Sequence, residues 1–123
     1  MAKVKASKAT KKPKTSKDTN IYMLNAVWFK ADGGEALYRK YMKTIGSLIS
    51  KVGGRKLKSF VIDRELVGEF DADLLFFVEY PSWQAYKDFA NSPEAHNAAY
   101  MKKEALERSM LLRCARPERS FWR

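Results

Sequence analysis

The sequence is poor in the residue types from which disulfides and metal sites are built. It has one cysteine, Cys114, which excludes an internal disulfide and suits a reducing compartment. It also has one histidine, His96, and no spacing of cysteine, histidine and carboxylate residues that is typical of a metal site. Because a Walker loop and a dinucleotide-binding fingerprint are missing as well, we predict neither a bound metal nor a cofactor.

Long apolar runs are also missing. No run approaches the ~20 residues of a membrane-spanning helix. Residues 1–20 contain no apolar segment of the kind found in a secretory signal. We therefore predict a protein that does not insert into a membrane and that is located in the cytoplasm.

Residues 1–20 lack aromatic side chains and nearly lack acidic ones. They carry seven lysines less one aspartate, which gives +6 of the net charge of +10. Such a segment cannot bury enough apolar surface to offset its ordering entropy, so we predict a disordered, lysine-rich arm. Its lysines, from Lys3 to Lys17, suit nucleic acid or another polyanion. A solubilising extension would have the same composition, and that alternative stays open.

The rest of the chain shows alternating strand and helix patterns. Runs of apolar and β-preferring residues predict strands over residues 21–29, 55–66, 74–80 and 110–118. Helical spacing between capping and stop signals predicts helices from Asp32 to Gly53, from Ser82 to Asn91, and from Ser92 to about Arg108. This order, βαββαβ with a broken second helix, is typical of an α+β ferredoxin-like fold with a four-stranded antiparallel sheet.

The predicted sheet has one uncovered face. In the ferredoxin-like order the first and third strands are central, and these are the two most apolar strands of the sequence. Both helices pack on the same face, so the other face would be an apolar patch larger than a soluble monomer normally exposes. Pairing of two such sheets buries this patch. We therefore predict a homodimer of a domain spanning residues 21–118, followed by a short tail, residues 119–123.

A set of spaced motifs resembles a known family. The motifs are Tyr38 and Tyr41, Gly53-Gly54-Arg55, Gly68-Glu69-Phe70, the segment Phe76–Glu94, and "LLRCARPE" near the end. In these, the chain from about Tyr22 to Glu118 resembles the small bacterial family named domain of unknown function 1330, of the dimeric α+β barrel superfamily. Ala95 stands where that family usually has tyrosine. The resemblance implies a dimeric barrel but no single reaction, because related barrels include cofactor-free monooxygenases, haem-degrading enzymes, dehydratases and isomerases.

Three polar residues interrupt otherwise apolar strands and form the first candidate site. Asn25 and Glu79 fall on the two central strands, and Arg113 falls on the strand beside the first. Buried polar groups need partners, so we expect a Glu79–Arg113 pair beside Asn25. Such a group could orient a small carbonyl-bearing or anionic ligand, or it could be a purely structural network.

His96 is the second candidate, and we assign it together with Glu79 to acid–base catalysis. An imidazole can exchange protons near neutral pH. An exposed residue on a polar helix turn is the alternative. Trp28 and Tyr38 are assigned to the lining of a ligand cavity, although aromatic residues at these spacings also form protein cores.

These observations leave three functions open. The one we favour is a dimer that binds, or transforms without a cofactor, a small apolar or aromatic ligand through His96, Glu79, Asn25 and Arg113. The second is a non-enzymatic dimeric module whose basic arm binds nucleic acid or another polyanion, with avidity from the duplicated arm. The third, haem binding through His96, follows only from the relatives of the barrel.

Overall fold

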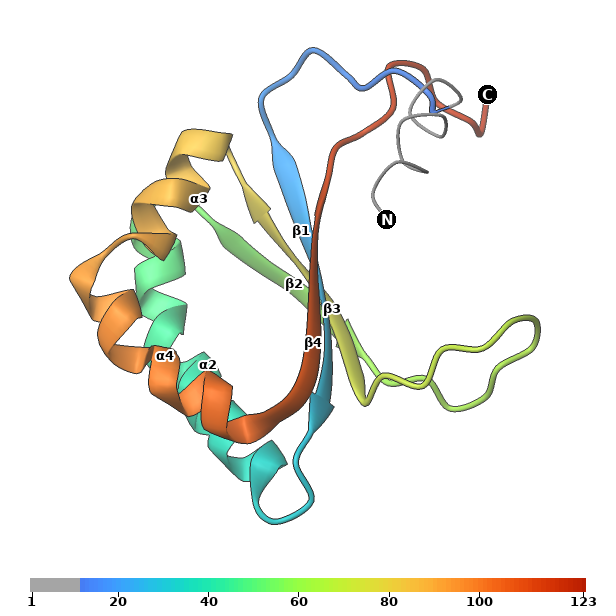
Figure 1. Ribbon diagram of the computed structural model, residues 1–123. Helices are drawn as coiled ribbons and strands as arrows, with labels where there is room; N and C mark the ends of the chain where they lie inside the picture. The colour runs from blue at the N-terminus through green and yellow to red at the C-terminus, as the bar shows by residue number, and fades with distance from the viewer. Residues whose placement is uncertain (1–11) are drawn as a thin grey trace, which may run out of the picture.

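The computed structural model describes residues 12–123, which form one sheet and the helices packed on it (Figure 1). In chain order the elements are β1 (Ile21–Phe29), α2 (Gly34–Lys51), β2 (Arg55–Phe60), β3 (Leu74–Tyr80), α3 (Trp83–Ala90), α4 (Pro93–Ala105) and β4 (Leu106–Cys114). The strands pair antiparallel in the order β2-β3-β1-β4. The predicted α+β ferredoxin-like fold, with the first and third strands in the centre, is confirmed.

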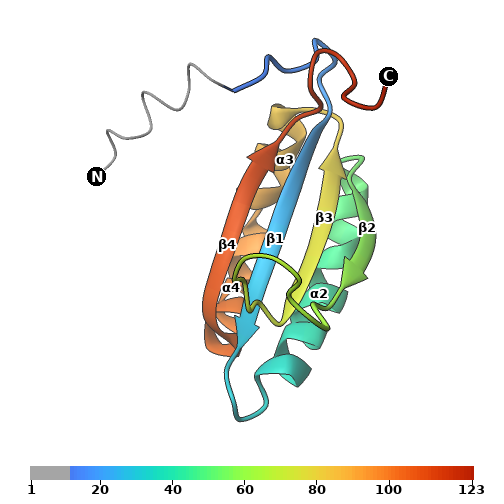
Figure 2. The same ribbon diagram turned by 90° about the vertical axis from the view of Figure 1, so that its right-hand side faces the viewer.

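Strand β1 divides its side chains between the two faces of the sheet. Met23 and Val27 are buried beneath the helices in the main core. Leu24, Ala26 and Trp28 point the other way, because successive side chains of a strand alternate. We call this second side the open face, since the helices of residues 12–123 all lie on the other one (Figure 2). The connection between β2 and β3 stands out from the open face (Figures 1 and 2).

Two serine caps place the broken helix over the sheet. The hydroxyl oxygen of Ser82 accepts a hydrogen bond from the Ala85 N–H at 3.0 Å, and that of Ser92 accepts one from the Ala95 N–H at 3.1 Å. Pro93 lies in the first turn of α4, where a helix needs no N–H donor. Both predicted helix starts are confirmed.

The start of α2 and the end of β2 differ from the sequence prediction. Gly33, with a φ of 79°, is the N-cap of α2 instead of Asp32. The Glu35 carboxylate accepts a hydrogen bond from Arg39 at 2.8 Å, one turn ahead, and forms no capping box. Strand β2 ends at Phe60 rather than at residue 66, because the register with β3 ends there.

The boundary between α4 and β4 lies earlier than predicted. The helix was expected to reach about Arg108, but it ends at Ala105, and β4 follows at once from Leu106. Leu106 is buried and pairs with Phe29 at the end of β1, after a shift of register between Trp28 and Phe29. This pairing with the central strand explains why the polar residues after Leu106 adopt an extended conformation. The strand therefore begins at Leu106 and not at residue 110, where the sequence predicted it.

The two ends of the described chain run side by side (Figure 1). The N–H of Glu118 donates to the carbonyl oxygen of Lys14 at 2.7 Å, next to an isolated antiparallel bridge. Part of residues 12–20, which the sequence analysis assigned to the arm, therefore has backbone partners. Residues 1–11 lie outside the described residues, so the disorder predicted for them stays a prediction.

Candidate ligand cavity

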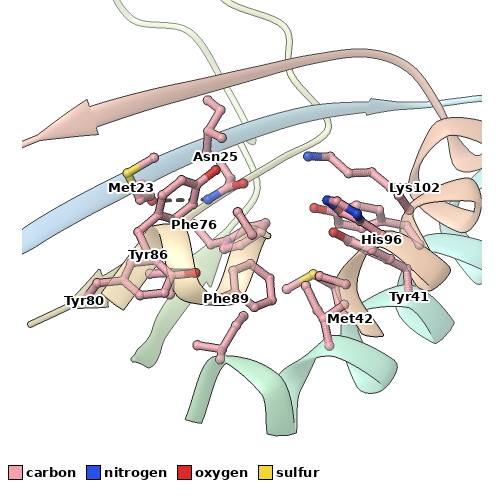
Figure 3. A pocket seen from close by; sticks show the side chains of 18 residues that line it. Met23, Asn25, Tyr41, Met42, Phe76, Tyr80, Tyr86, Phe89, His96 and Lys102 are labelled. Carbon is pink, nitrogen blue, oxygen red and sulfur yellow. Dashed lines mark hydrogen bonds between the residues drawn. The ribbon is translucent and has the colours of Figure 1, made fainter. Parts of the chain in front are cut away.

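A cavity of about 220 Å³ lies between the helices and the covered face of the sheet (Figure 3). Met23 and Phe76 contribute to its floor from β1 and β3, and its walls come from α2, α3 and α4. Ala90, Ala95 and Ala99 line it from the broken helix, and their small side chains leave the space open. Most of the lining is apolar or aromatic, as in sites that bind small molecules.

Polar groups gather on one side of this cavity. His96 and Lys102 extend into it from α4, and Tyr41 extends from α2 beside them (Figure 3). Asn25 faces these groups from β1, and one N–H of its amide donates to the carbonyl oxygen of Met23 at 3.2 Å. The hydrogen bond orients the amide at the edge of the cavity. The site is thus apolar over most of its surface, with His96, Lys102 and Tyr41 at one end and Asn25, Tyr80 and Tyr86 toward the other (Figure 3).

Burial controls the charge of several groups at the cavity. The pKa of the Lys102 ammonium lies below its ordinary value because burial disfavours the charged form. Burial raises the pKa of Tyr38 and of Tyr41, and the nearby Tyr86 adds to the rise for Tyr41. Both hydroxyl groups therefore stay protonated at neutral pH, and each can donate a hydrogen bond.

Of the residues predicted from the sequence, Asn25, Tyr38 and His96 line the cavity, and His96 is also exposed to solvent, as its alternative interpretation expected. The other predicted residues lie elsewhere in the structure. The candidate catalytic pair of His96 and Glu79 is not assembled, because Glu79 belongs to the opposite side of the sheet.

Glu79 points to the open face, and its expected pairing with Arg113 is wrong. Asn25 on β1 opposes Phe76 on β3, three positions before Glu79. An odd separation along a strand places two side chains on opposite faces, so Asn25 and Glu79 cannot meet. The Glu79 carboxylate instead accepts a hydrogen bond from the Arg55 guanidinium at 3.1 Å. This hydrogen bond holds the pKa of Glu79 below its ordinary value.

Arg113 and Trp28 are engaged with other side chains outside the cavity. The Arg113 guanidinium lies 4.5 Å from the centre of the Trp83 ring. The indole N–H of Trp28 donates to the Asp71 carboxylate at 2.9 Å, and the Arg108 guanidinium lies 4.2 Å from the centre of the indole ring. Both residues therefore contact other side chains and do not line the cavity.

Sequence reasoning missed most of the cavity lining, including Lys102, Tyr41 and Tyr86. A lysine in a helix of mixed polarity is usually solvated, and nothing in its local sequence sets Lys102 apart. The helical repeat carries the signal that could have found it. Ala95, Ala99 and Lys102 are separated by four and three residues, so they lie on one stripe of α4 that faces the sheet.

The structure bears on two further sequence expectations. Residues 12–123 contain no cluster of three or more histidine, cysteine and carboxylate side chains that could hold a metal ion. Nor does any helix in this range have the length and the apolar character needed to cross a membrane. The expected absence of a cofactor and the cytoplasmic location stay predictions.

Comparison with families of known sequence identifies the domain. A model of the family described as "Domain of unknown function (DUF1330)" matches residues 22–113. The matched range includes nearly all of the four strands and all of α2, α3 and α4. No match was found among curated proteins.

Solved structures with the same fold include proteins of unknown and of known activity. A protein of unknown function from Rhodopseudomonas palustris is 22% identical, with a TM-score of 0.72 over 94% of this chain and 93% of that one. A dimeric ferredoxin-like protein of unknown function from Jannaschia sp. is 15% identical, with a TM-score of 0.63 over 76% of this chain and 96% of that one. The hydroxynitrile lyase from Passiflora edulis is 15% identical, with a TM-score of 0.67 over 84% of this chain and 98% of that one. At these identities the likeness shows the fold alone.

Proposed function

Since the chain belongs to the family named domain of unknown function 1330, whose description gives no activity, we propose a function from the cavity itself. The protein binds a small apolar or aromatic ligand between the sheet and the helices, and His96 exchanges a proton with that ligand. The observation that carries the proposal is the cavity of about 220 Å³ with His96, Lys102 and Tyr41 together at one end.

The size of the cavity suits a compound with one ring. A dry protein cavity of about 150 Å³ can hold benzene. The space of about 220 Å³ therefore leaves room for a ring and a small substituent. Phe76, Phe89 and Met42 offer apolar contacts to such a ring. A groove between α2 and β2 shares the lining residues Tyr38, Met42 and Phe76 with the cavity.

The proton-transfer role falls to His96 alone. Its imidazole can accept or donate a proton, and the neighbouring Tyr41 hydroxyl can hold the ligand by a hydrogen bond (Figure 3). No carboxylate among the described residues lines the cavity. Glu79 therefore takes no part in this proposal, which departs from the assignment made on the sequence.

The shared fold is compatible with chemistry on small molecules. The Passiflora edulis protein is by its name a hydroxynitrile lyase, so an enzyme of this class is built on the same arrangement of strands and helices. Function resides in the site and not in the fold. The proposal therefore names a ligand and a proton-transfer group for this chain and no reaction.

Ligand-detected fluorine NMR with a set of single-ring fluoroaromatic compounds tests the proposal. Wild-type protein is expected to broaden and shift the signals of some members of the set. Ala95→Phe fills the cavity from α4 and is expected to abolish this binding, because Ala95 lines the cavity. Asn97→Phe adds the same ring on the exposed side of the same helix and serves as the control. Binding that persists in Ala95→Phe contradicts the proposal.

Two copies of the chain pair through the open face in this proposal. In the sheet register Leu24 lies between Phe77 and Leu112, so three apolar side chains cross the centre of this face. Phe77 and Leu112 are 37% and 44% exposed in the single chain. Leu66 and Val67, in the connection that stands out from the same side, are more exposed still (Figure 1). A second copy would cover these groups, and the dimeric neighbour from Jannaschia sp. supports such pairing.

Polyanion binding is a second candidate function, and the pairing of the chain ends favours it. Residues 14–16 run beside residues 116–118, which brings the backbone of Lys14 close to that of Arg116. Phe121 and Trp122 are exposed in that segment. Basic groups beside exposed aromatic rings suit single-stranded nucleic acid, whose bases stack and whose phosphates need neutralisation. Salt-dependent binding of a labelled oligothymidylate that weakens in Trp122→Ala is expected, and no binding at low salt contradicts this function.

A further inference from the structure

The polar end of the cavity carries positive charge without a negative partner. The cavity lining includes Lys102, His96 and four tyrosines, and none of the lining residues is an aspartate or a glutamate. The two ion pairs found within residues 12–123 join other side chains, one along α2 and one between β2 and β3. The site thus offers hydrogen-bond donors and a cation, and it lacks the acceptor that would balance them.

Lys102 is the group that most needs such a partner. Its side chain is half-buried, and its ammonium reaches into the cavity near His96 (Figure 3). No ion pair joins it to any residue of the range 12–123, and residues 1–11 contain no acidic side chain. A partly buried ammonium loses hydration that an anion at close range can replace. The lowered pKa of Lys102 reflects the same burial.

The other end of the cavity is lined mainly by aromatic rings. Phe76 and Phe89 lie away from the ammonium, toward β3 and α3, together with the rings of Tyr80 and Tyr86 (Figure 3). The Tyr41 hydroxyl, which stays protonated because its pKa is raised, lies on the same side as Lys102 and can donate to an anion bound there. A ligand that satisfies both ends has one compact anionic group and one ring or branched apolar group.

We therefore propose that the cavity binds a small aromatic or branched aliphatic carboxylate. The Lys102 ammonium holds the carboxylate, Tyr41 and His96 lie at its side, and the apolar end contacts Phe76 and Phe89. This inference rests on the proposed function, because it names the ligand class of the same cavity. A neutral ligand leaves the ammonium without a counter-ion, and a cationic ligand is repelled by it. Two acceptor oxygens on one small group also match the several donors that meet there.

Paired titrations followed by fluorine NMR test the inference on the full-length chain. The two probes, 4-fluorobenzoate and 4-fluorobenzamide, share one ring and differ in a carboxylate against a neutral amide. Wild-type protein should bind the benzoate at least about tenfold more tightly, which is the usual gain from one hydrogen bond to a charged group. Lys102→Met keeps most of the side-chain length and removes the charge. It should weaken benzoate binding by about tenfold or more and change benzamide binding by less than about twofold.

Lys103→Met is the matched control, because Lys103 is the exposed next residue of α4 and lies outside the cavity. It should leave both affinities unchanged. Equal losses of benzoate binding in the two variants would mean that general positive charge attracts the probe, and would overturn the inference. Equal affinity of the two probes for wild-type protein would overturn it as well, and this comparison needs no variant that must fold.

The same titrations separate the inference from the function on which it rests. Benzamide binding that exceeds benzoate binding and is abolished by Ala95→Phe would overturn the inference and leave the cavity as a ligand site. Binding of neither probe would overturn the inference and would count against the proposed function too.

Discussion

The two faces of the central sheet are built from the same strands, but they differ in how their polar groups are satisfied. On the open face, Glu79 is paired with Arg55, and the apolar row through Leu24 and Phe77 needs only a cover. On the covered face, Lys102 has no ion-pair partner within residues 12–123 and lies beside unfilled space. The difference teaches that burial alone does not mark a site. A site is marked instead by a polar group that has no partner and that lies beside an open cavity.

The largest expected effect comes from breaking the apolar row of the open face. Phe77→Lys places a charge in the interface of the proposed dimer, once from each copy. Burying an unpaired charge costs several kcal/mol, so the dimer dissociation constant should rise by at least about a hundredfold. Sedimentation equilibrium measures this constant. Tyr100→Lys changes an exposed aromatic residue on α4 and should pair like wild type. Equal dimerisation of both variants contradicts the assignment of the open face.

The next effect concerns Trp28, which the sequence placed in the cavity lining and the structure places on the open face. Trp28→Ala should lower the free energy of unfolding by about 3 kcal/mol, because a buried aromatic ring is lost. Urea denaturation measures the change. The milder Trp28→Phe should keep the wild-type affinity for 4-fluorobenzoate. A loss of that affinity in a folded Trp28→Phe variant would return Trp28 to the ligand site.

Lys102→Met should stabilise the chain modestly at neutral pH, raising Tm by about 3 °C, because the half-buried charge is removed. The folded-state pKa of Lys102 lies below its unfolded value, so the charge destabilises the native state at lower pH. The penalty fades as pH rises from the folded pKa to the unfolded one. Thermal melts of wild type and variant should therefore converge at alkaline pH. A gap that stays constant with pH contradicts the burial of this ammonium.

Glu79→Gln should give the smallest effect, a fall in Tm of about 2 °C at pH 7, because ion pairs with an exposed partner are weak. The folded-state pKa of Glu79 lies below its unfolded value, so its stabilisation is present at neutral pH. The stabilisation is lost as pH falls through the folded pKa. Wild type and variant should converge at acid pH, the reverse of the trend for Lys102. Divergence at acid pH would be the contrary result.

Much of the fold could be predicted from the sequence, because its signals are local. The runs Ile21–Phe29 and Leu74–Tyr80 match β1 and β3 at both ends, and Ser82 and Ser92 cap the helices that they were expected to cap. The helix-to-strand boundary at Leu106 was misplaced because it depends on a distant partner, the end of β1. Local propensity carries no information about that pairing.

Only part of the candidate site could be predicted, since its assembly depends on register and on helix placement. Asn25 and Glu79 look equivalent in the sequence, as single polar residues in apolar strands. The residue of β3 that opposes Asn25 decides whether Asn25 and Glu79 share a face, and a register shift of one position would bring both to the same face. Lys102 shares a helical stripe with Ala95 and Ala99, but only the placement of α4 over the sheet shows that this stripe faces a cavity.

The measurement that tests the central claim most directly uses the methionine methyl groups as reporters of the two faces. Met23 and Met42 line the cavity, whereas Met110 packs with Trp28 on the open face. Methyl NMR of selectively labelled full-length protein, titrated with 4-fluorobenzoate, observes all three at once. The account predicts shifts of Met23 and Met42 that saturate together, with Met110 unchanged. A shift at Met110 with Met23 and Met42 unmoved, or no shift at any of them, would contradict it.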